Sequence, residues 1–244
     1  MNLTIDIGNT TTKIIVFSDT VPVYRMVVKE LSSTFIRSLL KRLPIEYCLL
    51  SSVVKVKQPV LSSLSTIKHF RRMKSTTLLP IKNRYKTPST LGNDRLANAI
   101  AGAFLFPGKN VLVIDAGTCI KYDFINSKGE YIGGSISPGM EMRFKSLHLF
   151  TGKLPLVYDE KIKKLTGQST REALQTGVIV GITEEIKGFI TRYKEQYKTL
   201  NVIITGGDSK RFAEELKMSI FAAADMVNLG LNEIIRYQYL TKKI

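Results

Sequence analysis

The sequence predicts a duplicated mixed α/β fold, because two segments of this 244-residue chain repeat one pattern of strands and turns. In each segment an apolar strand ends in Asp, one further residue and Gly: residues 3–10 read LTIDIGNT and residues 112–118 read LVIDAGT. Two more strand-like segments follow each copy, at 13–17 and 22–28 and again at 120–125 and 131–137. We therefore expect two similar lobes, residues 1–107 and residues 108–244.

The remaining segments of both halves fit alternating helices and strands. Ser32 and Ser33 can cap a helix whose apolar residues share one face before Pro44 ends it. The other expected helices start near Pro59 and span 93–106, 138–150, 172–197 and 226–240, with one more capped by Asp208 and Ser209. Buried strands are expected at 46–54 and 201–205, and the irregular stretch 74–91 is predicted to be a loop that contributes to a site.

Composition and charge narrow the class of protein. The apolar fraction of 44% is ordinary for a globular protein, and no apolar run approaches the ~20 residues that cross a bilayer, so no membrane partner is expected. The strand-like start lacks the pattern of a signal peptide, which favours the cytoplasm. The net charge of +16 fits a solvated basic face or a phosphate-handling enzyme. Basic and aromatic residues do not alternate as on single-strand-binding surfaces, so no nucleic-acid partner is expected.

The first Asp-x-Gly turn has residue types suited to binding phosphate. It comprises Asp6, Ile7, Gly8, Asn9, Thr10, Thr11, Thr12 and Lys13. We expect this tight turn to need Gly8 and Asn9 for positive φ, which leaves backbone N–H groups pointing out of the turn. These amides and the threonine hydroxyls can bind phosphate oxygens. Lys13 adds a positive charge, and Asp6 can hold a hydrated cation that the phosphates share. An ordinary hairpin has the same residues, so this copy alone leaves both interpretations open.

The second copy, Asp115 to Thr118, favours phosphate binding, because a plain hairpin is not expected to recur with both Asp and Gly retained. We expect the two turns, one from each lobe, to bind a polyphosphate from opposite sides of a cleft. The chain contains no P-loop motif and no GxGxxG fingerprint, so the other common sequence routes to a nucleotide are unsupported.

Two further motifs each allow a structural and a functional interpretation. Residues 202–209 read VIITGGDS, which suits the close approach of a base or ribose and equally a plain strand-to-helix turn. Residues 92–95 read GNDR at the start of a helix. There Asp94 can accept a hydroxyl proton and Arg95 can bind a carboxylate bidentately, whereas simple helix capping by Asn93 or Asp94 is the alternative.

Taken in order, these motifs resemble the type III pantothenate kinases, within the acetokinase, sugar-kinase, chaperone-ATPase and actin superfamily. The resemblance covers nearly the whole chain through residues 6–10, Tyr85, 91–95, 115–118, 131–139, 151–155 and 204–208. It implies a duplicated actin-like, ribonuclease H-like α/β fold with the nucleotide in the cleft. It also implies ATP-dependent phosphorylation of pantothenate to 4'-phosphopantothenate, the first step of coenzyme A biosynthesis.

The resemblance further implies roles for single residues. Asp6 to Lys13 would bind the phosphates of ATP, which is accompanied by Mg²⁺, and Thr118 would contact them from the opposite lobe. Asp94 would be the general base, in a pantothenate pocket lined by Tyr85, Gly92, Asn93 and Arg95. Asp115 would hold a monovalent cation, K⁺ or NH₄⁺. Thr170 would reach pantothenate from the partner subunit, which implies a homodimer.

One position departs from the family pattern, because Lys121 stands where a hydroxyl residue is usual. Three alternatives remain beside the pantothenate kinase. One is a related kinase or phosphatase with another small carboxylate acceptor, and another is a basic nucleic-acid-binding or regulatory protein that keeps the fold without catalysis. A filament or chaperone ATPase is the third, although the chain has no obvious extra subdomain.

Overall fold

The structure, a computed structural model, describes residues 1–158 and 164–240 of the chain. Its contacts divide into two compact units. The first comprises Met1–Gly108, Ile125–Ile132 and Asp225–Ile244, and the second comprises Lys109–Phe124 and Gly133–Ala224. The division at 108 lies one residue from the expected boundary. Residues 225–244, however, group with the first unit rather than with the lobe 108–244 in which the sequence analysis put them.

The first unit contains a five-stranded sheet of order β3-β2-β1-β4-β5. Its strands are β1 (Asn2–Ile7), β2 (Thr12–Ser18), β3 (Val21–Val28), β4 (Tyr47–Ser52) and β5 (His69–Arg72). The central strand β1 is antiparallel to β2 and parallel to β4. The carboxyl end of β1, which carries Asp6, therefore lies beside the carboxyl end of β4.

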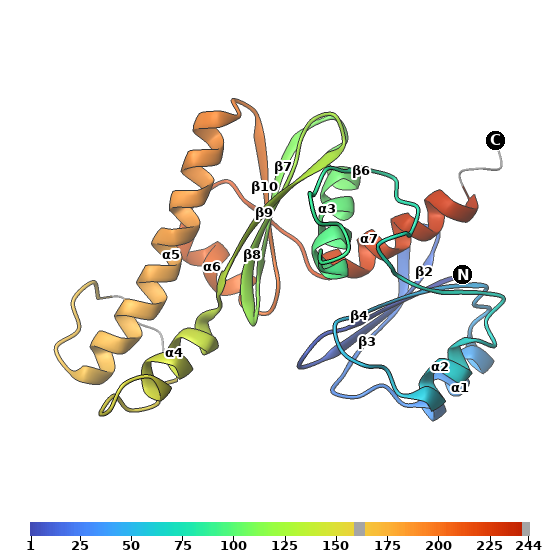
Figure 1. The fold of residues 1–244 in the computed structure, drawn as a ribbon, viewed down its shortest axis with the longest axis horizontal. Helices are drawn as coiled ribbons and strands as arrows, with labels where there is room; N and C mark the ends of the chain where they lie inside the picture. The colour runs from blue at the N-terminus through green and yellow to red at the C-terminus, as the bar shows by residue number, and fades with distance from the viewer. Residues whose placement is uncertain (159–163, 241–244) are drawn as a thin grey trace. The chain divides into compact units, whose positions relative to one another are not determined.

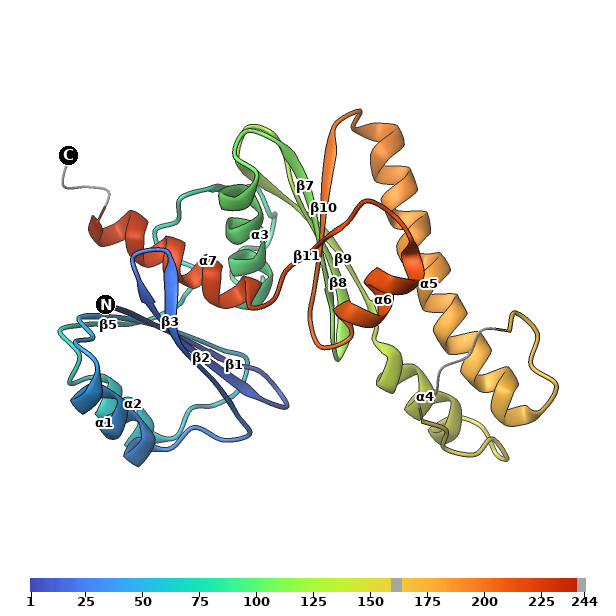
Figure 2. The ribbon, with the colours of Figure 1, turned by 180° about the vertical axis from the view of Figure 1, so that it is seen from behind.

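Helices cover both faces of this sheet (Figures 1 and 2). On one face, α1 (Ser33–Arg42) and α2 (Gln58–Leu64) contribute Ile36, Leu39, Val60 and Leu64 to a core with Leu3, Ile5, Ile14 and Val16. On the other face lie α3 (Asn93–Leu105) and α7 (Met226–Ile235), which pack against each other. Ser32 caps α1, as its sequence predicts, by accepting a hydrogen bond from the Phe35 N–H.

Polar side chains attach α7 to the first unit. Asn232 Oδ1 accepts a hydrogen bond from Asn2 Nδ2 (2.9 Å), and Asn228 Nδ2 donates to Thr4 Oγ1 (3.1 Å). All four residues are buried, and buried polar groups that are hydrogen-bonded specify one register between the elements that carry them. These contacts to β1 explain why the C-terminal segment groups with the first unit although it follows the second in sequence.

The second unit repeats the strand order of the first. Its sheet reads β9-β8-β7-β10-β11, from the strands β7 (Asn110–Ala116), β8 (Cys119–Ile125), β9 (Glu130–Pro138), β10 (Leu200–Thr205) and β11 (Phe221–Ala222). The short β6 (Lys82–Asn83) pairs with the first residues of β9, which group with the first unit. The equivalent strand orders confirm the predicted duplication of a mixed α/β unit.

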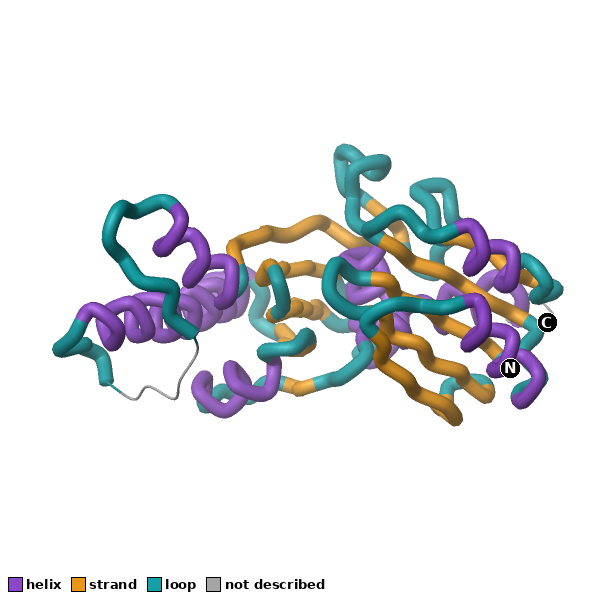
Figure 3. Tube along the Cα trace, turned by 90° about the horizontal axis from the view of Figure 1, so that it is seen from below, coloured by secondary structure: helices purple, strands orange, loops and turns teal. Residues whose placement is uncertain are grey.

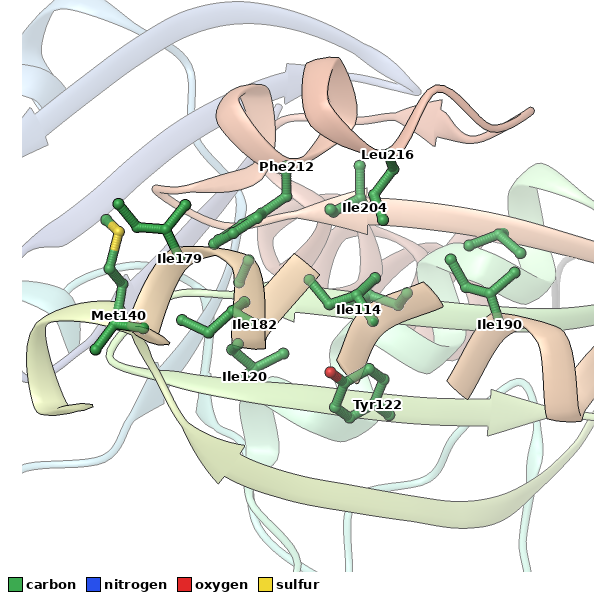
Figure 4. Packing of buried hydrophobic residues seen from close by; sticks show 14 of the residues in the cluster. Ile114, Ile120, Tyr122, Met140, Ile179, Ile182, Ile190, Ile204, Phe212 and Leu216 are labelled. Atoms are coloured by element: carbon green, nitrogen blue, oxygen red, sulfur yellow. The ribbon is translucent and has the colours of Figure 1, made fainter. Parts of the chain in front are cut away.

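Three helices accompany the second sheet: α4 (Met140–Leu149), α5 (Thr170–Gln196) and α6 (Ser209–Leu216). Figure 4 shows Ile179, Ile182 and Ile190 of α5 packed with Ile114, Ile120 and Tyr122 of the sheet. Helix α4 lies beside α5 (Figure 3). Glu185 on α5 fastens this arrangement, because it accepts hydrogen bonds from Tyr122 Oη (2.8 Å) and Ser137 Oγ (2.6 Å) and pairs with Arg143.

The predicted elements agree with the structure to within a few residues at most ends. The sequence analysis missed the short strands β5, β6 and β11, of which β6 lies inside the predicted loop 74–91. The predicted helix 226–240 consists of α7 followed by a π-helix at Arg236–Leu240. Within the residues that the structure describes, no helix is long and apolar enough to cross a membrane.

Candidate functional site

The first Asp-x-Gly turn joins β1 to β2 in the first unit. Neither Gly8 nor Asn9 adopts positive φ, so the expectation that this turn needs left-handed residues was wrong. The Gly8 N–H donates to the Thr11 carbonyl oxygen (3.0 Å) across the turn. A Cβ at position 8 would lie 3.2 Å from that oxygen, a tight contact that a larger residue would strain. Glycine is therefore explained by the closeness of the chain to itself rather than by its φ.

The side chains of this turn differ in exposure. Asn9 and Thr10 are exposed, whereas Thr12 is buried within β2. Asp6 is half-buried, and its Cα partners in the sheet are Lys13 and Ser51. A phosphate at this turn would thus meet the exposed amide and hydroxyl of Asn9 and Thr10 before any buried group.

A pocket of about 280 Å³ lies beside the turn. Its lining combines Ile7, Gly8, Asn9 and Thr12 with the segments 29–31 and 54–57 and with Val60. Three lysines, Lys29, Lys55 and Lys57, are among these residues, and Lys57 pairs with Glu30. The sequence analysis did not single out these lysines. The signal was the position of Lys55 and Lys57 just after β4, since ligands of α/β sheets bind outside the carboxyl ends of the strands.

The first turn of α3 carries the GNDR motif. Its N-cap is Gly92, which makes no side-chain cap hydrogen bond, and Asp94 follows within the first turn. Asp94 Oδ1 accepts a hydrogen bond from the Arg95 N–H (2.9 Å). Asp94 therefore satisfies one of the free backbone N–H groups at the start of the helix, as the capping interpretation predicted. A Cβ on Gly92 would lie 2.5 Å from the same oxygen. Glycine at this position therefore leaves room for the observed orientation of the Asp94 carboxylate.

Hydrogen bonds fix the start of α3 near the sheet edge that carries Asp6. Asn93 Nδ2 donates to the Met73 carbonyl (3.3 Å), and the Met73 N–H donates to the Leu50 carbonyl on β4 (2.9 Å). Leu50 precedes Ser51, the sheet partner of Asp6. The GNDR motif and the first phosphate turn are thus tied to the carboxyl ends of two neighbouring strands, although Asp94 and Asp6 are 94 − 6 = 88 residues apart in the chain.

Arg95 and Tyr85 come together beside this motif. Arg95 is 5% exposed, and its guanidinium carbon lies 5.7 Å from the centroid of the Tyr85 ring, within the range of a cation–π contact. The Tyr85 ring in turn lies 6.0 Å from that of Tyr131. Tyr85 belongs to the predicted loop 74–91, which is mostly without regular structure and does contribute to this cluster. An arginine held by an aromatic ring suits a planar carboxylate, which its fork of N–H donors can bind bidentately.

Helix α3 is positioned by a backbone contact with α7. A Cβ on Gly230 of α7 would lie 1.9 Å from the carbonyl oxygen of Ala97 on α3. Ala97 is three residues after Asp94, which is about one helical turn. The crossing of α3 and α7 therefore sets the location of the residues in the first turn of α3.

The second Asp-x-Gly turn, in the second unit, is shorter than the first. Only Gly117 and Thr118 separate β7 from β8, and neither has positive φ. The Thr118 carbonyl oxygen accepts the Gly139 N–H (3.1 Å), and a Cβ on Gly139 would lie 2.1 Å from the Gly117 oxygen. The backbone of the turn is therefore held by Gly139, while the Thr118 side chain is exposed.

Asp115, at the end of β7, contacts the side chain that departs from the family pattern. Lys121 Nζ lies 2.8 Å from Asp115 Oδ2. The other carboxylate oxygen, Oδ1, would lie 2.6 Å from a Cβ on Gly206, whose φ of +96° also requires glycine. Gly206 belongs to the TGGDS turn after β10, where the Asp208 N–H donates to the Ala116 carbonyl (3.0 Å). The turn thus packs against the second Asp-x-Gly copy.

Thr170 is the first residue of α5 and is exposed. Ser169 caps this helix by accepting the Glu172 N–H (3.2 Å), and Glu172 Oε2 accepts the Gln168 N–H (2.8 Å). This reciprocal arrangement fixes the helix start that carries Thr170. Thr170 also lines a largely apolar pocket of about 500 Å³ between α4 and α5.

No group of three or more His, Cys, Asp or Glu side chains that could hold a metal ion occurs among residues 1–158 and 164–240. Mg²⁺ that arrives with nucleotide phosphates needs only one or two protein carboxylates. Asp6 fits that requirement, because it is half-buried at the strand end beside the turn.

The chain is similar to known proteins over nearly its full length. A sequence profile of the type III pantothenate kinase family matches residues 2–192. A type III pantothenate kinase from Bacteroides fragilis is 43% identical over 238 residues, which cover 97% of this chain and 98% of that protein. One from Cytophaga hutchinsonii is also 43% identical, over 97% of this chain and 99% of that protein.

Solved structures with lower identity share the fold. A Campylobacter jejuni protein, provisionally described as a Baf family transcriptional activator, aligns with a TM-score of 0.61 and 21% identity over 97% of this chain and 98% of its own. The activator of 2-hydroxyisocaproyl-CoA dehydratase from Clostridium difficile, solved with bound ADPNP, aligns with a TM-score of 0.55 and 13% identity. The alignment covers 100% of this chain and 97% of that protein. These likenesses, with the repeated strand order, identify the two units as an actin-like duplication. By the profile match and by identity over nearly its full length, the chain belongs to the type III pantothenate kinase family.

Proposed function

We propose that this protein transfers the γ-phosphate of ATP to the hydroxyl of pantothenate, forming 4'-phosphopantothenate in the first step of coenzyme A biosynthesis. The observation that carries the proposal is the cluster at the start of α3. Asp94, a buried Arg95 and Tyr85 lie together there, and hydrogen bonds tie the cluster to the sheet edge that bears Asp6. An acid, a carboxylate-binding cation and a phosphate turn are the groups that phosphorylation of a hydroxy acid needs.

For ATP, we assign the phosphates to the turn Asp6–Lys13 and to Thr118. The exposed Asn9 and Thr10 side chains and the lysines of the neighbouring pocket support the first assignment, because they offer donors and positive charge. Bound Mg²⁺ would supply charge neutralisation to the phosphates, and Asp6 is the carboxylate that would hold it. Since phosphoryl transfer has a loose transition state, positioning and charge contribute most of the rate.

For pantothenate, we assign the pocket to Tyr85, Gly92, Asn93, Asp94 and Arg95. Arg95 would pair with the substrate carboxylate while its guanidinium stays against the Tyr85 ring. Asp94 would orient the substrate hydroxyl and accept its proton as the bond to phosphorus forms. The hydrogen bond from the Arg95 N–H to Asp94 Oδ1 supports this role, because it holds the carboxylate in one orientation.

We also propose a homodimer in which Thr170 contacts the pantothenate of the partner subunit. The supporting observation is a set of exposed apolar side chains at the end of α4 and in the chain between α4 and α5: Leu149, Phe150, Tyr158 and Leu165, of which Phe150 is 86% exposed. Large apolar side chains that gather on an exposed surface usually mark an interaction site, so these residues are candidates for the dimer contact. The predicted cytoplasmic location suits an enzyme that uses ATP.

The test is pantothenate-dependent release of ADP from Mg-ATP by the wild-type protein and by Asp94→Asn. We expect the variant to lose about 10²–10⁴-fold in kcat, the usual contribution of a positioned acid or base, with little change in KM for ATP. Glu195→Gln is the matched control, because it makes the same change from acid to amide at an exposed residue near the end of α5. Wild-type kcat in the Asp94 variant would remove the assignment, and no pantothenate-dependent turnover of the wild type would remove the proposed function.

A further inference from the structure

The ion pair between Lys121 and Asp115 is the feature that the proposed function leaves without a role. Lys121 Nζ lies 2.8 Å from Asp115 Oδ2, a distance typical of a charge-assisted hydrogen bond. The two side chains are only 20% and 14% exposed. A pair so shielded from water is weakly screened by salt, in contrast to an exposed ion pair such as Lys57 with Glu30.

Strand alternation brings the two residues together. Ile120 and Tyr122 belong to the hydrophobic core against α5 (Figure 4), so the side chain of Lys121 lies on the opposite face of β8. In the same way, Ile114 and Ala116 belong to the core, so Asp115 lies on the opposite face of β7. The pair is therefore part of the sheet face at the second phosphate turn, not part of the core.

The surroundings of Asp115 do not fit a free monovalent cation. The ammonium of Lys121 contacts Oδ2, and the Gly206 backbone lies so close to Oδ1 that a Cβ there would be 2.6 Å away. A K⁺ ion on Oδ2 would have to displace the ammonium, and the Gly206 backbone crowds one side of Oδ1. The structure thus disagrees with the expectation that Asp115 binds K⁺ or NH₄⁺.

We propose that the ammonium of Lys121 is a tethered cation that takes the place of a free monovalent cation at Asp115, so that turnover needs neither K⁺ nor NH₄⁺. A lysine ammonium is a compact point charge with three N–H donors, so it carries the same charge as the free ions and can contact more than one acceptor. Because it is part of the chain, it is present at any salt composition. The kinetic part of the inference rests on the proposed function, since it concerns that reaction.

The kinetic test compares the wild type, Lys121→Ser and Lys121→Met in potassium, ammonium and N-methylglucamine chloride at constant ionic strength. We expect the wild-type kcat to differ less than about twofold among the salts. Because both variants lose one preorganised charge, their kcat in N-methylglucamine should fall on the order of 10²-fold below that of the wild type. Potassium or ammonium should raise the kcat of Lys121→Ser at least about tenfold, because space for an ion opens beside Asp115 in this variant. Neither ion should raise the kcat of Lys121→Met, whose side chain fills that space. Lys128→Ser, an exposed lysine in the turn between β8 and β9, is the matched control and should behave as the wild type.

A second readout does not depend on turnover. The Tm of the wild type should be the same in potassium and in N-methylglucamine, whereas that of Lys121→Ser should rise by about 3 °C in potassium, as expected when the ion is at about ten times its Kd. A wild type whose kcat falls tenfold without potassium, or a Lys121→Ser enzyme with wild-type kcat in every salt, would overturn the proposal. If no salt gives pantothenate-dependent turnover, the proposed function fails. The Tm comparison then still tests whether Lys121 replaces the free cation. A wild-type Tm that is higher in potassium than in N-methylglucamine would overturn the proposal.

Discussion

Replacing Gly230 with alanine tests whether α7 positions the helix that carries Asp94. The added Cβ would lie 1.9 Å from the Ala97 carbonyl oxygen, 2.6 Å from its carbonyl carbon and 2.9 Å from its Cα. All three are backbone atoms, so no side-chain rotation can relieve the contact. Because ordinary contacts begin near 3.4 Å, α3 and α7 must part by about 1.5 Å at this point.

The expected effects follow from that displacement. Overpacking a close contact costs about 1–3 kcal/mol, and a backbone obstruction belongs at the upper end. Alanine in a helix interior recovers roughly 0.5–1 kcal/mol relative to glycine, which leaves a net loss of about 2 kcal/mol. For a chain of this length that lowers Tm by roughly 4–8 °C. Since Asp94 precedes Ala97 by one turn, a shift of about 1 Å there should lower kcat by on the order of 10²-fold.

The assay is thermal denaturation together with pantothenate-dependent ADP release at a temperature well below the variant's Tm. Gly188→Ala is the matched control, because a Cβ at Gly188 on α5 meets nothing within 4 Å and should stabilise by roughly 0.5–1 kcal/mol. If Gly230→Ala melts at or above the wild-type temperature, the backbone contact does not constrain the helices. If it is destabilised but keeps wild-type kcat, α7 does not position Asp94.

Two further predictions concern single contacts. Gly92→Ala should lower kcat by about 10²-fold, because the added Cβ would lie 2.5 Å from Asp94 Oδ1 and would push the carboxylate out of its position. The free energy of unfolding should fall by no more than about 1 kcal/mol, because alanine tolerates the φ of −59° at this N-cap. Steady-state kinetics with a melting curve separate the two effects, and an unchanged kcat would contradict the reasoning. Burial raises the pKa of Glu185, but hydrogen bonds from Ser137, Arg143 and Tyr122 outweigh it and hold that pKa below its ordinary value. The stability from Glu185 is therefore present above the ordinary pKa of about 4.3 and is lost as pH falls through the lower folded value. The Tm difference between wild type and Glu185→Gln should shrink between pH 5 and pH 3, and a constant difference would contradict it.

Local sequence patterns predicted most of the fold. Apolar segments predicted the longer strands of both units, and the cap at Ser32 and the alanine-rich helix from Asn93 appeared where expected. These features depend on neighbours within a few residues, so they can be read from the chain. The prediction of positive φ at Gly8 failed because it used only this local information. The identity of a residue shows which conformations it permits, whereas the contact with Thr11 decided which one it adopts.

The candidate site was predicted only in part. The Asp94, Arg95 and Tyr85 cluster was expected from residue types and resemblance, but the lysines at 29, 55 and 57 were not, because strand pairing brings their segments to the turn. A short pattern cannot reveal a pocket assembled from segments about 20 and 45 residues beyond it.

By itself, the sequence determined the α/β class, the duplication and the two Asp-x-Gly turns, because strand periodicity and turn chemistry are local properties of the chain. Only the tertiary structure decided that residues 225–240 pack with the first unit, since that depends on hydrogen bonds from Asn228 and Asn232 to residues more than 200 positions earlier. The same is true of the backbone contact between Gly230 and Ala97 and of the close approach of Gly206 to Asp115. Residues distant in the sequence meet only after the sheets and helices have packed, and the charges and spaces created there define what the site can bind.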